Sequence, residues 1–124
     1  MNTLPRPESL LPLPTAAFHI LLALADSERH GYGIMQEIAQ RTQGAMRMGP
    51  GTLYGSIKRM LADGLIEAAA ERPDPELDDE RRRYYRLTDF GLRVLRAEAQ
   101  RLEQIVGIIQ SKRILSNPRK IGGA

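Results

Sequence analysis

The chain of 124 residues contains no cysteine, no tryptophan and only two histidines. Without cysteine it can form no disulfide framework, no thiolate zinc site and no cysteine nucleophile. His19 and His30 are too few for a multi-histidine metal site, so we expect neither a metal nor another cofactor. The remaining composition, 42% hydrophobic and 27% charged residues, is typical of one globular domain with a single core.

Sequence motifs of common enzyme classes are also missing. The chain has no Gly-x-Ser-x-Gly nucleophile elbow. No Gly-Lys-Ser/Thr follows Gly49-Pro50-Gly51, as it would in a phosphate-binding loop. The acidic run between residues 74 and 80 lacks the alternating ligands and the glycine of a calcium loop. We therefore expect a protein that is not an enzyme.

The net charge and the first apolar segment give information on the binding partner and on the cellular location of the protein. A net charge of +3 and a pI of about 9.6 suit a polyanionic partner but do not identify one. Residues 16–25 resemble the apolar part of a signal peptide, but the segment before them is Pro-rich and balances Arg6 with Glu8. The run is too short to span a bilayer. We therefore expect a cytoplasmic protein without a membrane segment.

Turn and capping residues divide the first half of the chain into three helices. A Pro-rich lead at residues 1–13 shows no periodicity, and we expect it to be flexible. Thr15 is expected to cap the first helix, which is apolar on all sides and should be fully buried. Pro50 suits the start of the third helix, and Gly64 suits a left-handed stop after it. The helices are predicted over residues 16–26, 32–41 and 50–63, with a turn at 27–30.

The second half of the chain predicts a hairpin and a long helix. Two short strands are expected at residues 65–71 and 81–87. Thr88 is expected to cap a fourth helix within residues 89–115, and a flexible tail follows at 116–124. Apolar residues of this helix recur every seven positions, as they do in helices that pair with one another. The expected dimerisation residues are Leu95, Ala99, Leu102, Ile105, Val106 and Ile109.

Three helices, a two-stranded hairpin and a long terminal helix are the element order of a winged helix-turn-helix protein. The expected fold class is therefore mainly α with a two-stranded β-hairpin, extended by a long C-terminal dimerisation helix. Residues 14–88 would form the DNA-binding domain, and residues 89–115 would join two chains.

The third predicted helix has two different faces when its residues are placed at 100° intervals. The inward face carries Leu53, Ile57, Met60, Leu61 and Gly64. The outward face is small near its start and cationic further along, and it comprises Gly51, Thr52, Gly55, Lys58, Arg59 and Ala62. A helix in the major groove needs small residues at base edges and long cations near phosphates. The alternative is an ordinary amphipathic helix with a solvated outer face.

The second predicted strand combines arginines and tyrosines, as Arg81-Arg82-Arg83-Tyr84-Tyr85-Arg86. Its period of two directs Tyr85 and Leu87 toward the core. Arg82 and Arg86 then point outward, where they could contact phosphates from a wing. The alternative is that these arginines pair with Asp78-Asp79-Glu80, which would contribute little energy at a surface.

The two histidines allow structural and pH-sensing interpretations. His19 lies within an apolar helix, and we expect a histidine whose hydrogen bonds are satisfied at the core boundary. His30 precedes a glycine, and we expect its ring to hold backbone groups of the turn. A pH-sensing role for either rests only on the near-neutral pKa of an unperturbed imidazole.

Three stretches of the sequence carry a resemblance to a known protein family. They are His30-Gly31-Tyr32-Gly33-Ile34, residues 50–66 from Pro50-Gly51-Thr52-Leu53-Tyr54 to Gly64-Leu65-Ile66, and residues 83–91. The first resembles the start of the second helix in the PadR family of bacterial transcription regulators. The second resembles that family's recognition helix and the following strand, and the third resembles the end of its wing and the cap of its dimerisation helix. The stretches occur in the family's order, and the resemblance extends from Leu13 to about Ile114.

The resemblance implies a dimeric DNA-binding regulator, usually a repressor, that in some members is released by a small aromatic effector. The implied partners are double-stranded DNA on an inverted-repeat operator, a second copy of the chain and a small-molecule effector. Phosphate contacts are implied for a tyrosine at the start of the second helix and for arginines of the wing. With the outward face of the third helix, the expected DNA-binding residues are Tyr32, Gly51, Thr52, Tyr54, Lys58, Arg59, Arg82 and Arg83.

Two departures from the family pattern narrow these expectations. No aromatic residue follows Phe90, so the last helix offers no ring for stacking a flat drug at a dimer interface. The hairpin tip is acidic, so we expect DNA to repel it and to contact only the arginine-rich base. Its carboxylates are Asp74, Glu76, Asp78, Asp79 and Glu80.

A second class of function has to be weighed against DNA binding. Winged helices also serve as protein–protein interaction modules that bind no DNA. The cations of the third helix and of the second strand argue against that alternative, and salt-dependent binding to duplex DNA would separate the two.

Overall fold

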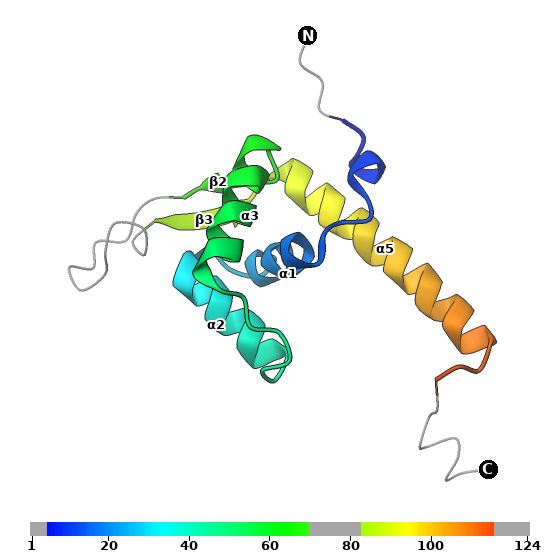
Figure 1. Cartoon of the computed structure of the whole chain (residues 1–124). Helices are drawn as coiled ribbons and strands as arrows, with labels where there is room; N and C mark the ends of the chain where they lie inside the picture. Colours follow the sequence, from blue (N-terminus) through cyan, green and yellow to red (C-terminus); the bar gives the residue numbers. More distant parts are fainter. Residues whose placement is uncertain (1–4, 70–82, 116–124) are drawn as a thin grey trace.

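The computed structural model describes residues 5–69 and 83–115, which form a helical domain with a small sheet and a long terminal helix (Figure 1). A 3₁₀ turn precedes the first helix. The elements in chain order are η1 (Pro7–Leu10), α1 (Thr15–Leu24), β1 (Arg29–His30), α2 (Gly31–Arg41), α3 (Pro50–Ala62), β2 (Ile66–Ala68), β3 (Tyr84–Leu87) and α5 (Asp89–Ser111). The helices α1, α2 and α3 gather around the sheet, and α5 extends away from them. The predicted mainly α, winged helix-turn-helix architecture is confirmed.

Most of the predicted helix boundaries depend on the expected capping residues. The Thr88 hydroxyl accepts a hydrogen bond from the Gly91 backbone N–H at 2.9 Å, which caps α5 as predicted. Gly64 has a φ of 75°, which stops α3 as predicted. The cap expected from Thr15 is wrong, because α1 begins at Thr15 itself and its N-cap residue Pro14 provides no side-chain cap.

The sheet has three antiparallel strands in the order β1-β3-β2 rather than the two that were predicted. In its register Arg29 lies opposite Tyr85, and Ile66 lies opposite Leu87. The additional strand β1 has two residues within the predicted turn, too few for an alternating pattern to indicate a strand. Among the described residues β2 covers only 66–68, so that strand is shorter there than expected.

The core lies between α1, α2, α3, the sheet and the first half of α5. Its fully buried side chains include Ile20, Ile34, Leu53 and Val94. The prediction that α1 is buried on every side is wrong. One face of α1 fills the core, whereas Phe18, His19 and Leu22 are only half-buried on the other.

Leu61 corrects the predicted inward face of α3. The buried stripe of this helix consists of Leu53, Ile57 and Met60, and Leu61 is 39% exposed. Successive residues are 100° apart around a helix, so the position after Met60 lies beyond the edge of a narrow stripe.

The Pro-rich lead is the largest departure from the predicted organisation. It was expected to be flexible, but η1 packs against α5, and Leu10, Leu11 and Leu13 pack against the core. The Leu13 backbone N–H donates to Glu98 of α5 at 2.9 Å. The leucines lie among prolines without helical or strand spacing, so no periodic signal marked them.

Glu98 is the one buried charged residue among those described, with 2% of its surface exposed. A buried carboxylate is tolerated when it is paired and hydrogen-bonded. Arg101 supplies the pair, with its Nε 2.5 Å and its Nη2 3.1 Å from the two carboxylate oxygens. The Arg101 hydrogen bond lowers the pKa of Glu98, burial opposes this effect, and the Leu13 N–H adds to it.

We expect Glu98 to make the folding stability depend on pH in acid. Its pKa is lower in the folded chain than the ordinary 4.5, so its contribution is complete above that ordinary value and is lost as pH falls through the folded pKa. Glu98→Gln should cost about 1–3 kcal/mol at neutral pH and flatten the acid dependence. Urea unfolding of both chains over an acid-to-neutral series measures this. If the free energy of unfolding fell equally with pH in both chains, the Glu98 carboxylate would not be what holds the lead against α5.

Within residues 5–69 and 83–115, no helix combines the length and the apolar character needed to cross a membrane.

Candidate nucleic-acid interface

The outward face of α3 is open to solvent as the sequence predicted. Gly51, Thr52, Gly55, Lys58 and Arg59 are all exposed, opposite the buried stripe of the same helix. A Cβ atom at Gly51 or Gly55 would meet no atom within 4 Å, so the first turns of this face are flat and unobstructed. A partner surface can therefore approach the backbone of α3 closely near its N-terminal end.

The two cations of this face hold no charge partner within the described part of the chain. Neither Lys58 nor Arg59 forms an ion pair or a side-chain hydrogen bond there. They lie two turns beyond Gly51 and Thr52 on the same side of the helix. The face therefore runs from small residues to unpaired positive charges, which is the distribution expected of a helix that meets base edges and then phosphates.

Tyr54 lies in a different place from the other predicted residues of this helix. It is half-buried, and its ring lies against Gly31 at the start of α2. A Cβ atom at Gly31 would be 2.8 Å from Cζ of the Tyr54 ring and nearer still to its hydroxyl. Tyr54 thus joins α2 to α3 and lies beside the open face rather than on it.

We expect Gly31→Ala to destabilise the protein by displacing the Tyr54 ring. Overpacking of this kind costs about 1–3 kcal/mol. Gly55→Ala is the matched control, because its Cβ meets nothing and alanine favours a helix. In urea unfolding, Gly31→Ala should lower the free energy of unfolding and Gly55→Ala should raise it slightly. Adding Tyr54→Leu to Gly31→Ala should recover part of the lost stability. If the stability changes of Gly31→Ala and Tyr54→Leu simply added, the contact between the two residues would be contradicted.

The start of α2 meets the base of the wing through a group of rings. His30 Nδ1 accepts the Gly33 backbone N–H at 2.8 Å, which confirms that its ring holds backbone groups. The His30 ring stacks on Tyr32 with centroids 6.4 Å apart and meets the edge of Tyr84 at 5.1 Å. Tyr32 is 41% exposed, and Arg83, next to Tyr84, is exposed too. Tyr32 and Arg83 therefore lie at the same cluster of aromatic rings, formed by His30, Tyr32 and Tyr84.

The wing arginines do not all remain available to a ligand. Tyr85 is buried and Arg86 is exposed, which confirms the predicted alternation on β3. Arg86 Nε donates to Glu67 at 2.8 Å, and its Nη1 lies 3.7 Å from Glu28. The hydrogen bond with Glu67 raises the pKa of Arg86 further. Arg86 thus pairs with one carboxylate of the neighbouring strand β2 and with another just before β1, and neither pairing was predicted from the sequence.

Two predicted features of the hairpin lie outside the described residues. They are Arg82, with its neighbour Arg81, and the acidic tip at residues 74–80. The expected wing contact by Arg82 and the repulsion of the tip by DNA stay predictions.

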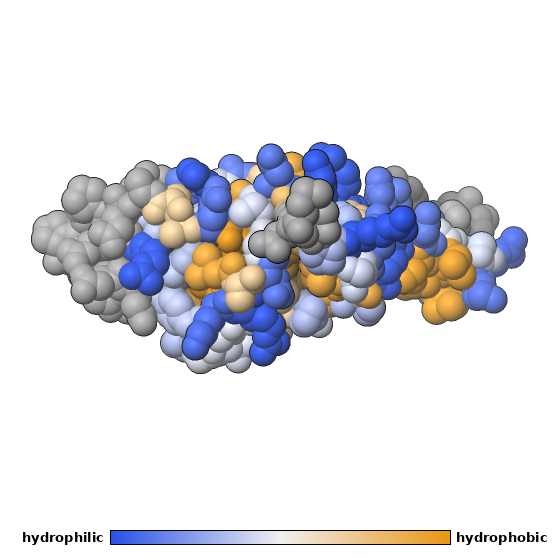
Figure 2. All heavy atoms as spheres, turned by 90° about the horizontal axis from the view of Figure 1, so that it is seen from above, coloured by the Kyte–Doolittle hydropathy of each residue, from blue (hydrophilic) through white to orange (hydrophobic). Residues whose placement is uncertain are grey.

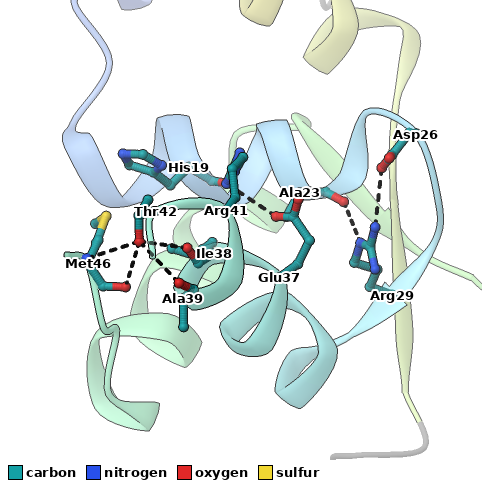
Figure 3. Close-up of polar contacts among 10 residues, drawn as sticks. All are labelled: His19, Ala23, Asp26, Arg29, Glu37, Ile38, Ala39, Arg41, Thr42 and Met46. Carbon is teal, nitrogen blue, oxygen red and sulfur yellow. Dashed lines mark hydrogen bonds and ion pairs between the residues drawn. The ribbon is translucent and has the colours of Figure 1, made fainter. Parts of the chain in front are cut away.

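Polar contacts fix β1 to α1 and shape the loop between α2 and α3 (Figure 3). Arg29 Nε donates to the Ala23 carbonyl at 2.7 Å. The Thr42 hydroxyl donates to the Ile38 carbonyl at 2.8 Å and accepts the Met46 N–H at 3.0 Å. The first contact anchors β1 at the end of α1, and the others shape the connection from α2 to α3.

His19 differs from the expected satisfied histidine. Its Nδ1 is buried and has no hydrogen-bond partner among the described residues. Arg41 donates to the His19 backbone carbonyl at 3.3 Å and pairs with Glu37 at 3.2 Å (Figure 3). Burial, and then the Arg41 charge, lowers the pKa of His19, so the neutral ring is favoured.

The outer half of α5 exposes apolar side chains. Ile105 is 37% exposed, Val106 44% and Ile108 55%. Figure 2 shows a hydrophobic area toward the end of the molecule where α5 lies. Among the other predicted dimerisation residues, Ala99 is exposed and Leu102 and Ile109 are half-buried, but Leu95 packs in the core of its own chain. The surface left for a partner therefore begins beyond Leu95.

Comparison with known proteins agrees with this architecture. The sequence model of the transcriptional regulator PadR-like family matches residues 20–97. A transcriptional regulator of Mycobacterium tuberculosis is 36% identical over 87 residues, which cover 70% of this chain and 75% of that protein.

Two solved structures share the fold. A PadR family transcription regulator from Clostridium difficile has a TM-score of 0.64 at 24% identity, covering 79% of this chain and 97% of the other. Bacillus subtilis PadR in complex with operator DNA has a TM-score of 0.59 at 22% identity, covering 69% of this chain and 47% of the other. From the family match and the relative together, the chain belongs to the PadR-like family of transcriptional regulators and is not an enzyme.

Proposed function

We propose that this protein is a cytoplasmic repressor that binds an inverted-repeat operator as a homodimer, with α3 of each chain in a major groove. The observation that carries this proposal is the outward face of α3. Its glycines leave the backbone open, and its two cations have no partner among the described residues. The solved complex of Bacillus subtilis PadR with operator DNA supports it, because that protein shares the fold.

Each part of the α3 face has a separate role in this proposal. Gly51 and Gly55 let the helix backbone approach the floor of the groove, and the Thr52 hydroxyl contacts a base edge. Lys58 and Arg59 reach the phosphates at the groove wall, where they supply affinity without sequence preference. Tyr54 sets the angle between α2 and α3, because its ring is held against Gly31.

The start of α2 and the base of the wing extend the contact along the backbone of DNA. Tyr32 contacts one phosphate and Arg83 another, since both are exposed beside the His30 and Tyr84 rings. Arg86 contributes less than the sequence suggested, because Glu67 and Glu28 already hold its guanidinium. Arg82 is proposed as a further phosphate contact of the wing.

The outer half of α5 supplies the dimer interface in this proposal. Its exposed isoleucine and valine side chains would leave an apolar area in water if the chain stayed alone. A second copy can cover it, with the half-buried Phe18 and Leu22 on the outer side of α1 completing the interface. Repression then follows from occupation of the operator, and a small-molecule effector would release it.

Binding to a duplex of random sequence, measured by fluorescence anisotropy over a range of salt concentrations, tests the proposal. We expect measurable binding whose logarithm falls linearly with the logarithm of salt, with a slope of about −0.9 for each phosphate contacted. Absence of binding at low salt would contradict the proposal and favour a protein–protein interaction module.

A further inference from the structure

A hollow of about 140 Å³ lies between the lead, the start of α1 and the second half of α3. Its floor is apolar and includes Leu13, Met60 and Leu65. Its rim carries three polar side chains of α3, which are Ser56, Arg59 and Asp63. Cavities of about 150 Å³ accept a benzene-sized molecule, so the hollow has room for one ring.

The polar groups of the rim have hydrogen-bonding capacity that the described residues do not use. Arg59 and Asp63 are four residues apart on one helix, a spacing at which opposite charges usually pair. The structure shows no ion pair between them. The Ser56 hydroxyl also makes no hydrogen bond with a described residue. Donors and acceptors thus surround an apolar floor without neutralising one another.

We propose that the hollow is an effector site for a small uncharged molecule with one ring and an amide-like head. The head's carbonyl accepts from Arg59, its N–H donates to Asp63, and its ring rests on Met60. A carboxylate fits less well, because Asp63 and the negative end of the α3 dipole oppose it. An ammonium or amidinium group is opposed by Arg59.

The site has a direct route to DNA binding, which rests on the proposed function of α3. Arg59 belongs both to the rim of the hollow and to the cationic face of the helix. A guanidinium held by a ligand carbonyl is withdrawn from its phosphate. Occupancy therefore lowers DNA affinity and lowers the salt slope by about one unit per chain.

Binding itself is tested with benzamide, benzoate and benzamidine, which share a ring and differ in the charge of the head. The readout is the methyl NMR signal of Met60, with Met35 of α2, which does not line the hollow, as the internal control. Benzamide should shift the Met60 signal saturably with a Kd of about 1 mM, as expected for a fragment of this size. Benzoate and benzamidine should bind at least several-fold more weakly.

Two variants outside the proposed DNA contacts sharpen the test. Ser56→Leu fills the mouth of the hollow and should abolish the Met60 shift. Asp63→Asn removes the negative charge and should strengthen the binding of benzoate relative to that of benzamide. No Met60 shift with benzamide at several millimolar, a shift that persists in Ser56→Leu, or tighter binding of either charged probe would each overturn the site.

The effect on DNA is measured separately, with saturating benzamide and a random duplex. Wild type should lose affinity and about one unit of salt slope per chain, whereas Arg59→Ala should show no further change in slope. If benzamide shifted the Met60 signal but left DNA binding unchanged, the proposed effect of the ligand on DNA affinity would be overturned. A Met60 response in a protein that binds no DNA would contradict the proposed function and leave the ligand site supported.

Discussion

A chain in which Leu102 and Val106 are both replaced by glutamate is expected to sediment as a monomer, whereas the unmodified protein sediments as a dimer. Val106 is 44% exposed and Leu102 is half-buried without joining the core cluster, so the folded domain should tolerate the charges. In a paired α5 the four new carboxylates would be forced out of water close to one another, at a cost that exceeds what the interface gains.

The matched control places the same charges on the other side of the helix. Gln100 and Gln104 are exposed polar residues of α5, and their replacement by glutamate should leave the dimer intact. Circular dichroism of both variants would confirm that α5 stays helical. A Leu102→Glu, Val106→Glu chain that still sediments as a dimer would show that α5 does not form the interface.

Loss of the dimer should also weaken DNA binding strongly. Linking two recognition helices raises the overall affinity by about 100-fold to 10,000-fold over a single one, because the second contact becomes intramolecular. The monomeric variant should therefore bind a two-site operator no better than a duplex with one half-site. Equal affinity of the monomeric and dimeric forms for the full operator would contradict a two-fold arrangement.

Removal of the α3 cations is the second change with a large expected effect. Lys58→Ala and Arg59→Ala should each weaken binding to every duplex by a similar factor, because phosphates carry no sequence information. Each should lower the salt slope by about one unit per chain, and the double variant by about two. Thr52→Ala should instead change which sequences are preferred.

Lys112→Ala is the control for a general loss of charge. Lys112 is exposed at the end of α5, away from the α3 face, and its removal should leave the salt slope unchanged. Should Lys58→Ala and Arg59→Ala bind like Lys112→Ala, the outward face of α3 would not lie against DNA.

The helices that carry the interface could be predicted because their signals are local. Pro50 and Gly64 bound α3 within one residue, and Thr88 caps α5 through the residue three positions further on. The two faces of α3 follow from the 100° rotation per residue, with Leu61 as the one misplaced side chain. Short-range rules of this kind need no knowledge of the rest of the chain.

The features that were missed depend on contacts between distant parts of the sequence. Glu98 binds the backbone of Leu13, 85 residues away, and no pattern in either segment indicates the other. Tyr54 was expected at the DNA interface from the family resemblance, but its ring turns toward Gly31, where the absence of a side chain leaves room for it. Arg86 is paired by Glu67 of the adjacent strand, which only the sheet register reveals.

The central claim is that a two-fold dimer binds an inverted-repeat operator. The most direct test is to let the unmodified protein select duplexes from a random pool and then to footprint the enriched sequence. A two-fold dimer presents two copies of α3 to successive major grooves. We therefore expect an inverted repeat with half-sites about 10 base pairs apart, or a multiple of that spacing, and protection of both halves. An enriched sequence with a single asymmetric site, or a pool from which no sequence is enriched, would contradict the account.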